Sequence, residues 1–171
     1  MYLCFINSLF LYIERVNIVI NIDILVGSTL GGTEYVAEAT QPFLEAAGFA
    51  SQVHFSPDLT LLDIEGQHIW LICLATHGAG DYPDNFKMFV EQINNLSDEL
   101  TNVHFGLIGV GDSNYDTYCH AAKHFDLLLR DKGATRLGNI FNIDVVDSPI
   151  PEDRVDDWIP LWIKDLNLLT N

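Results

Sequence analysis

The pattern of apolar and polar residues along the chain predicts strands that alternate with helices. Five segments have the apolar runs or the period-two alternation of strands: 18–26, 49–55, 68–74, 103–110 and 139–146. Four segments space their apolar residues as amphipathic helices do: 35–48, 86–93, 118–132 and 156–169. Pro160 is expected in the first turn of the last helix or at a kink in it.

Strands that alternate with helices predict an α/β fold with a doubly wound parallel sheet, right-handed crossovers and helices on both faces. In such sheets ligands bind outside the carboxyl ends of the strands, where the strand order reverses. The loops that follow the first, third and fourth strands are therefore the first places to look for a site.

The turn after the first strand is rich in glycines and hydroxyls and precedes a helix. It contains Ser28, Thr29 and Thr33, and it has no Lys or Arg. Hydroxyls, a glycine backbone and the free N–H groups of a helix N-terminus make a cradle for one phosphate group held by neutral donors. The alternative is an ordinary helix cap, in which Ser or Thr satisfies the first N–H groups.

Two better-known phosphate loops do not fit this turn. Gly27 and Gly32 have the spacing of a P-loop, but Thr33 stands where the loop needs Lys, which argues against triphosphate chemistry. The G-x-G-x-x-G sequence that binds dinucleotides is absent.

Charge and cysteine content narrow the class of protein. The 171 residues include 24 Asp and Glu but only 8 Lys and Arg, for a formal net charge of -16. Nucleic acids and anionic membranes need basic surface, so a basic protein is the favoured partner. Cys4, Cys73 and Cys119 form no C-x-x-C motif, which indicates reduced thiols and the cytoplasm. Cys73 lies in an apolar run and is expected to be inert core.

The apolar segment at the N-terminus, residues 1–13, lies before the predicted strands and helices. It is too short to span a bilayer, and it lacks the basic start and small-residue cleavage site of a signal peptide. We expect residues 1–16 to be an upstream extension, with an additional element or a weak anchor as the alternative, and residues 17–171 to be one domain.

Three loops together resemble the flavodoxin family. The first loop is similar to the FMN phosphate loop [ST]-x-T-G-x-T, with Leu30 in place of the middle Thr. The loop Thr76–Asn85 is similar to T-[YW]-G-x-G-D-x-P-D-N, and Gly109–Cys119 to G-x-G-D-x-x-Y-x-x-[FY]-C, both from the FMN domains of diflavin reductases. The details are closest to the MioC-type short flavodoxins.

The resemblance implies a five-stranded sheet of order 2-1-3-4-5 and a domain that binds FMN non-covalently and transfers electrons. It implies a flavodoxin or ferredoxin reductase as donor, an acceptor enzyme for which biotin synthase is a candidate, and a monomer or weak dimer. No catalytic side chains or metal are expected, because the cofactor does the chemistry. The expected cofactor-binding residues are Ser28, Thr29, Leu30, Gly31, Gly32, Thr33, Thr76, His77, Gly78, Ala79, Gly80, Gly111, Asp112, Tyr115, Tyr118 and Cys119.

Several roles in this set have alternatives. Tyr115 is the candidate to stack on the isoalloxazine, or it folds onto the surface of its turn. His77 covers the other flavin face, where relatives carry Tyr or Trp, or it is exposed. Gly78 and Gly80 let the backbone change conformation beside the flavin, or they are ordinary turn glycines. Asp112 bonds the flavin edge or caps its own loop.

Other clusters receive simpler interpretations. His120 and His124 have helical metal-ligand spacing without a third ligand, so we expect a solvated face. Trp158 and Trp162 are expected to pack the last helix on the sheet. The acidic residues after the fifth strand are either a docking surface or a solvated end: Asp144, Asp147, Glu152, Asp153, Asp156 and Asp157.

Two other functions use the same fold. An FMN-dependent NAD(P)H:quinone reductase is the alternative enzyme, although the scarcity of Arg and Lys argues against a nucleotide-phosphate clamp. A response-regulator receiver needs an acidic pair after the first strand and a Lys after the fifth, and the sequence has neither.

Overall fold

The structure is a computed structural model that describes residues 20–97 and 99–170. The expected N-terminal extension, residues 1–16, lies outside the described residues. Strands occupy β1 (Asn21–Gly27), β2 (Ala50–His54), β3 (His68–Ala75), β4 (Val103–Gly111), β5 (Thr135–Arg136) and β6 (Phe141–Asp144). The α-helices are α1 (Gly32–Ala46), α2 (Asp84–Asn95), α3 (His120–Asp131) and α4 (Ile159–Thr170), and the 3₁₀ turns are η1 (Leu59–Leu61) and η2 (Pro151–Asp157).

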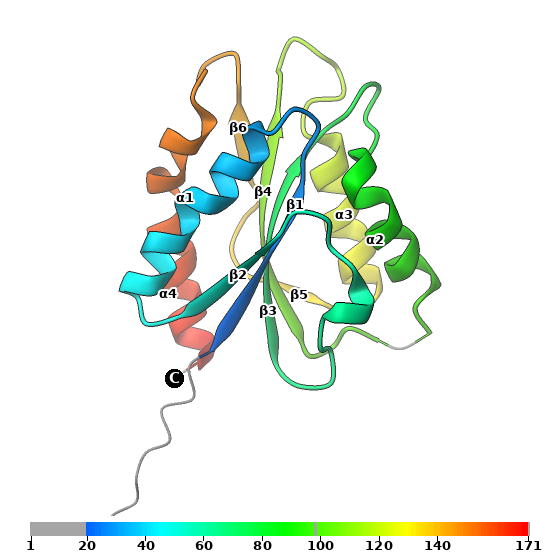
Figure 1. Cartoon of the computed structure of the whole chain (residues 1–171), viewed down its shortest axis with the longest axis vertical. Coiled ribbons are helices and arrows are strands. Elements are labelled where there is room, and N and C mark those ends of the chain that lie inside the picture. The colour runs from blue at the N-terminus through cyan, green and yellow to red at the C-terminus, as the bar shows by residue number, and fades with distance from the viewer. Residues whose placement is uncertain (1–19, 98, 171) are drawn as a thin grey trace, which may run out of the picture.

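All strand pairs of the sheet are parallel, and the strand order is β2-β1-β3-β4-β5, with β6 also paired to β4. The predicted fold class and order are confirmed. All four strands from β1 to β4 have their carboxyl ends at the same edge, at the top of the molecule in Figure 1. The loops of interest therefore meet there.

The expected fifth strand, 139–146, is present but shorter: it is β6, which pairs with residues from Ile108 to Gly111 of β4. The sequence did not predict the two-residue strand β5, which pairs with His104 and Phe105 on the same edge of β4. Between them the chain leaves the ladder at Gly138, which has a φ of 71°. A left-handed residue interrupts the extended backbone, and glycine adopts that conformation without steric cost.

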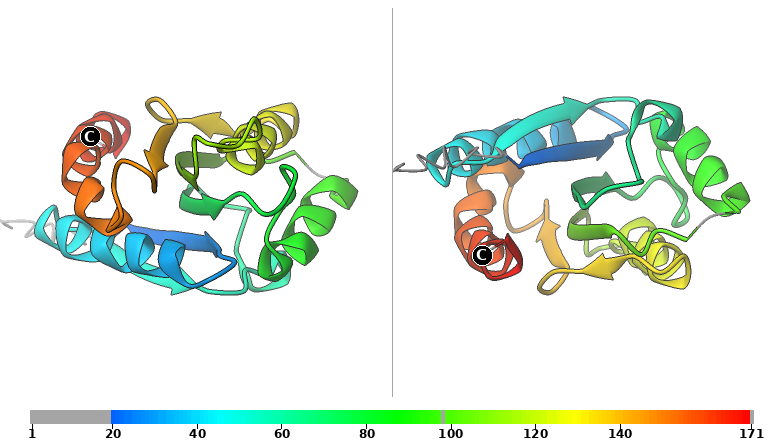
Figure 2. Two further views of the ribbon diagram at one scale, coloured as in Figure 1. Left: turned by 90° about the horizontal axis from the view of Figure 1, so that it is seen from above. Right: turned by 90° about the horizontal axis from the view of Figure 1, so that it is seen from below.

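Two layers of helices cover the sheet, one on each face. Helices α1 and α4 lie on one face and α2 and α3 on the other, as Figures 1 and 2 show. The core under α1 and α4 is built on Ile22, Ile24 and Cys73. Leu25 and Trp70 point to the opposite core, under α2 and α3. Strands buried on both faces explain the continuous apolar runs in the sequence.

The last helix is partly as predicted. The predicted helix 156–169 begins instead with the 3₁₀ turn η2, and α4 starts only at Ile159. Pro160 stands in the first turn of α4, where its missing N–H has no intrahelical acceptor to lose. Trp158 and Trp162 are 7% and 1% exposed and belong to the core beneath α4, so their predicted packing role is confirmed. Cys73 is also fully buried, as expected of a core cysteine.

Candidate functional site

A cavity of about 420 Å³ opens at the carboxyl edge of the sheet, among the loops that follow β1, β3, β4 and β6. Its volume suits a mononucleotide-sized ligand. Four loops that are distant in sequence contribute to its wall: Thr29, Leu30, Gly32, Thr33, Ala75, Thr76, His77, Gly78, Val110, Gly111, Asp112, Tyr115, Thr117, Tyr118, Cys119, Val145 and Pro151.

The β1–α1 turn presents backbone donors to this cavity. Gly31 precedes the helix with a φ of 88°, and among residues 20–97 and 99–170 no side chain caps the N-terminus of α1 with a hydrogen bond. The Ser28 hydroxyl oxygen instead accepts a hydrogen bond from the N–H of Gly31, the residue just before α1, at 3.0 Å. This bond closes the turn ahead of the helix. The free N–H groups of α1 and the positive end of its dipole suit an anion. Thr33 lines the cavity although only 3% of its surface is exposed.

Asn85, in the first turn of α2, holds the start of the β1–α1 turn in place. Its Oδ1 accepts a hydrogen bond from the Ser28 N–H at 3.1 Å. Its Nδ2 donates to the carbonyl oxygens of Val26, at 3.0 Å, and Phe55, at 2.7 Å. One side chain thus joins the ends of β1 and β2 to the turn. Asn85 belongs to the second loop motif in the sequence, but sequence reasoning did not include it in the site.

The loop after β3 is closed by its own backbone. His77 and Asp81 exchange N–H···O bonds of 2.9 and 2.8 Å, and between them Gly78 and Gly80 have φ angles of 51° and 108°. These angles are the reason for glycine at both positions, because other residues rarely adopt them. His77 lines the cavity and is exposed; that it covers a flavin face remains a prediction.

The loop after β4 forms the opposite wall. Asp112 Oδ1 accepts a hydrogen bond from the Asn114 N–H at 2.8 Å, so Asp112 caps its own loop, and it also lines the cavity. Tyr115 lines the cavity with 64% of its surface exposed, which leaves a ring face available to a planar ligand. Cys119 precedes α3 with a φ of 52°, a left-handed conformation for a residue with a Cβ.

Burial controls the ionisation of the two residues at the end of this loop. It raises the pKa of the Tyr118 phenol to about 12 and that of the Cys119 thiol to about 11. Lys123 donates from Nζ to the Tyr118 carbonyl oxygen at 2.9 Å and lies over the Tyr118 ring, 5.7 Å from its centroid. Both cavity-lining groups are therefore neutral near pH 7 and give the wall an uncharged surface.

The loop after β6 completes the cavity with Val145 and Pro151. Arg154 in η2 holds this loop by donating to Asp157 at 2.6 Å and to the Ser148 hydroxyl at 3.0 Å. The acidic residues of this region do not share one environment. Asp144 is hydrogen-bonded and partly buried, and Asp157 is paired with Arg154. Asp147, Asp153 and Asp156 are exposed.

The structure brings most of the predicted site residues together. Four of them do not line the cavity: Ser28, Gly31, Ala79 and Gly80. Ser28 and Gly31 shape the first turn, and Gly80 lies against Thr117 and His120. Five cavity-lining residues were missed: Ala75, Val110, Thr117, Val145 and Pro151. Ala75 is the last residue of β3 and Val110 is next to the last residue of β4, positions that the carboxyl-edge rule indicates.

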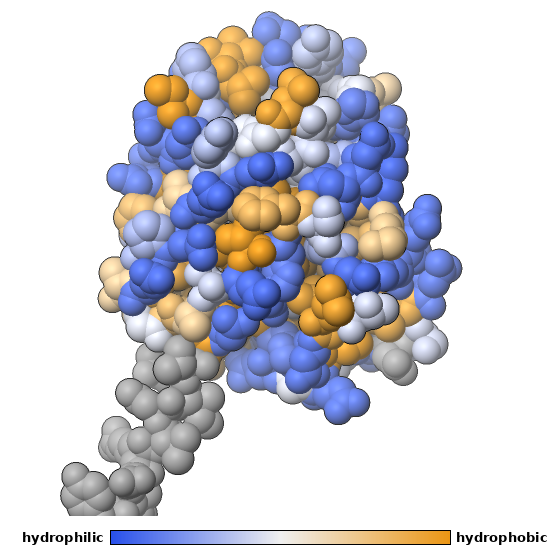
Figure 3. Space-filling model, viewed as in Figure 1, coloured by the Kyte–Doolittle hydropathy of each residue, from blue (hydrophilic) through white to orange (hydrophobic). Residues whose placement is uncertain are grey.

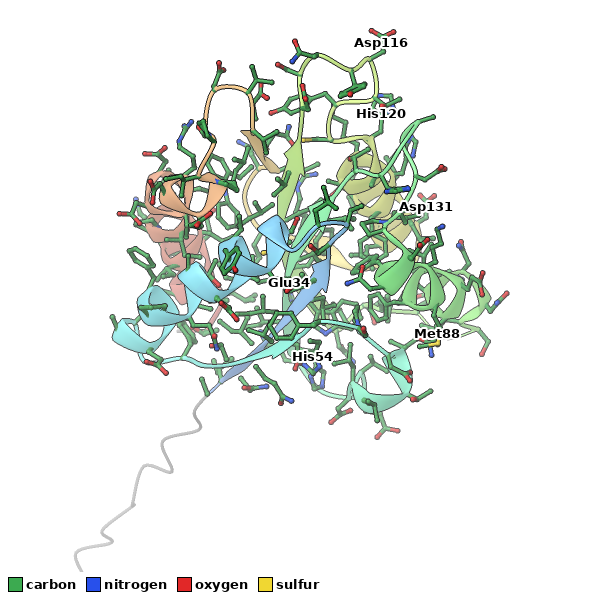
Figure 4. All side chains as sticks on the ribbon, turned by 45° about the horizontal axis from the view of Figure 1, so that its top comes forward. Glu34, His54, Met88, Asp116, His120 and Asp131 are labelled. Carbon is green, nitrogen blue, oxygen red and sulfur yellow. The ribbon has the colours of Figure 1, made fainter. Side chains whose placement is uncertain are left out.

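Other kinds of site find no support in the described part of the chain. Residues 20–97 and 99–170 contain no group of three or more His, Cys, Asp or Glu side chains placed to hold a metal ion. The His120 and His124 rings lie 5.6 Å apart, and His124 is exposed. Figure 4 shows His120 beside the β4–α3 loop that carries Asp116. None of the helices in these ranges combines the length and apolar character of a membrane span.

The fold and the cavity define a doubly wound α/β protein with a mononucleotide-type site at the carboxyl edge of its sheet. The sequence model of the flavodoxin family, described as "Flavodoxin", matches residues 24–158. The chain is 41% identical over 144 residues to protein MioC of Escherichia coli K12, which covers 84% of this chain and 97% of MioC. It is 32% identical to flavodoxin YqcA of the same strain, covering 82% of this chain and 95% of YqcA.

Solved structures agree with this assignment. A flavodoxin from Pseudomonas aeruginosa, solved as a cysteine-to-serine mutant, superposes with a TM-score of 0.74 at 24% identity, covering 86% of this chain and 99% of that one. A flavodoxin from Streptococcus pneumoniae TIGR4 gives 0.70 at 24% identity, covering 86% and 98%. The chain belongs to the flavodoxin family, and it is an electron-transfer flavoprotein with FMN as its cofactor.

The residues present fit FMN. A turn with neutral donors and an uncapped helix N-terminus suits one terminal phosphate. The rest of the cavity wall is largely uncharged and apolar apart from Asp112, which suits a planar ring system.

Proposed function

We propose that this chain is a diffusible carrier that takes electrons from a flavodoxin- or ferredoxin-type reductase and delivers them to an acceptor enzyme. The observation that carries the proposal is the convergence of four loops on one open cavity at the carboxyl edge of the sheet. When bound, FMN supplies the one-electron chemistry, and the protein supplies binding, orientation and electrostatics.

Each end of the cavity has its own task in this proposal. The α1 N-terminus and Thr33 hold the phosphate, and Asn85 keeps the turn in place. Tyr115 and His77 flank the ring system. Gly78, with its positive φ, allows the backbone to lie close to the ring edge. The side chains around the ring orient it and exclude water from part of its surface.

Charge at the loop end supports a basic partner. Asp112, Asp116 and Asp147 lie on the loops that surround the cavity, and Asp153 lies in η2, whose first residue, Pro151, lines it. The cations Lys123 and Arg154 in the same region are engaged in contacts within the chain. An acidic rim accelerates the encounter with a basic reductase and weakens in salt. Exposed apolar side chains at the same end, Leu30 and Ile150, provide desolvated contact area, and Figure 3 shows apolar surface at the top of the molecule.

The relatives named MioC motivate the more specific part of the proposal. We propose biotin synthase as one acceptor, the cytoplasm as the location, and a monomer or weak dimer as the working form. Exposed carboxylates on three of the loops around the cavity, Asp81, Asp116 and Asp147, favour transient contacts over a large permanent interface.

Electron transfer from NADPH tests the proposal. The purified protein should carry FMN, identified by its absorption spectrum and by the mass of the released cofactor. With NADPH alone the flavin should stay oxidised, and a catalytic amount of flavodoxin reductase should bleach it. The rate should fall as the salt concentration rises. Rapid bleaching by NADPH alone would instead identify an NAD(P)H-dependent reductase.

A further inference from the structure

In the part of the chain that the structure describes, one side chain that does not itself line the cavity hydrogen-bonds to both loops at its ring end, the loop after β4 and the loop after β6. Gly111 at the end of β4 is the sheet partner of Asp144 at the end of β6, and beyond this pair the two strands separate into loops. The Val145 N–H still donates to the Gly111 carbonyl oxygen at 2.9 Å. Beyond that bond, another contact is needed to hold the two loops at a fixed distance from each other.

Asp144 supplies the connection. Its Oδ1 accepts a hydrogen bond from the Ser113 N–H of the β4–α3 loop at 3.2 Å and one from the Val146 N–H of its own loop at 3.0 Å. The Ser113 side chain also hydrogen-bonds the carboxylate, and this bond is the main reason that the pKa of Asp144 is lowered. Ionised acceptors make stronger hydrogen bonds than neutral ones.

Both loops depend on this carboxylate for their relative position. The β4–α3 loop brings Asp112 and Tyr115 to the cavity, and the loop after β6 brings Val145. These residues lie within three positions of the groups that Asp144 holds. A loop that is free to move by a fraction of an ångström forms a poorer wall, because binding then has to order it.

We propose that Asp144 is a positioning residue that fastens the two loops around the flavin ring, rather than one more charge of an acidic docking surface. The neighbouring Asp147 has the same charge on the same loop. It is exposed, and it has no hydrogen bond or ion pair within residues 20–97 and 99–170. The pair therefore separates the loss of a charge from the loss of the connection.

The inference rests on the assignment of this cavity to FMN, and its test compares the variants D144A, D144N and D147A as apoproteins. Titration with FMN and with riboflavin by quenching of flavin fluorescence gives the two dissociation constants. D144A should weaken both ligands by a similar factor, about tenfold, because the fastened loops contact the ring that both ligands share. D144N keeps an acceptor oxygen and should lose less, and D147A should bind as wild type does.

A second measurement needs no cofactor. Amide hydrogen exchange of the apoprotein should accelerate at Ser113 and Val146 in D144A, and it should stay at the wild-type rate in D147A. If D144A does not fold, D144N against D147N carries the comparison, with a smaller loss expected only in D144N.

The outcomes separate this inference from the proposed function. Equal losses of affinity in D144A and D147A would overturn the fastening role, and so would wild-type affinity and exchange in D144A. Neither outcome would affect the assignment of the cavity to FMN. Failure of the wild-type protein to bind FMN would overturn the assignment of the cavity itself.

Discussion

Replacing Asn85 with alanine tests how the phosphate end of the cavity is built. The substitution removes three hydrogen bonds, to Ser28, Val26 and Phe55, without changing any atom that lines the cavity. If the β1–α1 turn binds the phosphate, the loss should appear mainly in the affinity for a phosphorylated ligand.

The magnitude follows from the number and type of these bonds. Each is a neutral hydrogen bond with a net value of about 1 kcal/mol, so the free energy of unfolding of the apoprotein should fall by about 3 kcal/mol. Only the Ser28 bond acts directly on the turn. Its share, about 1 kcal/mol, corresponds to a roughly fivefold increase in the dissociation constant of FMN. Riboflavin, which has no phosphate, should bind with nearly unchanged affinity.

The assay measures both dissociation constants by fluorescence quenching under conditions in which the variant is folded, as far-UV circular dichroism and urea unfolding establish. Asn95→Ala on the same helix is the matched control, because Asn95 is exposed in the last turn of α2, far along the helix from Asn85. The control should leave both affinities at wild-type values.

Equal losses of FMN and riboflavin affinity in Asn85→Ala would refute this reasoning. Asn85 would then act through the stability of the whole fold, and the result would give no support for phosphate binding at the turn after β1. An unchanged FMN affinity despite a lowered free energy of unfolding would show that the turn keeps its shape without the Ser28 bond.

Three further substitutions and one reagent address the rest of the wall. Thr33→Val should weaken FMN binding by about 0.5–1.5 kcal/mol and leave riboflavin binding unchanged, as fluorescence titration can measure. Unchanged FMN affinity would show that Thr33 only packs in the wall. Gly111→Ala places a methyl group 3.0 Å from the Cys119 nitrogen and the Tyr118 ring, so urea unfolding of the apoprotein should show a loss of about 1–3 kcal/mol. Gly32→Ala, with open space around its Cβ, should not lose stability. Iodoacetamide should label Cys119 slowly at pH 8 and faster as the pH rises, because burial raises the thiol pKa to about 11 and only the thiolate reacts. Rapid labelling of the folded protein at pH 8, seen by mass spectrometry, would mean that the wall opens.

Local sequence determined the elements and the general position of the site. Apolar runs with β-branched residues specify strands, and the glycine-rich turn before α1 specifies a break with free N–H groups, because these preferences act over a few neighbouring residues. The alternation of strands and helices then limits the sheet to a parallel one. For that reason, the loops with Thr33, His77 and Tyr115 can be identified from the sequence alone.

Tertiary structure decided what distant segments do to one another. The interruption of the edge strand at Gly138 depends on the backbone path between two separate pairings with β4, and neighbouring residues do not reveal it. Val145 and Pro151 became part of the cavity because β6 ends beside β4. Asn85 stands in a recognised loop motif and Asp144 in an acidic group, but nothing in the sequence shows which groups their side chains bind. Their importance comes from bonds that cross 57 and 31 positions of sequence, which only the folded chain brings within reach.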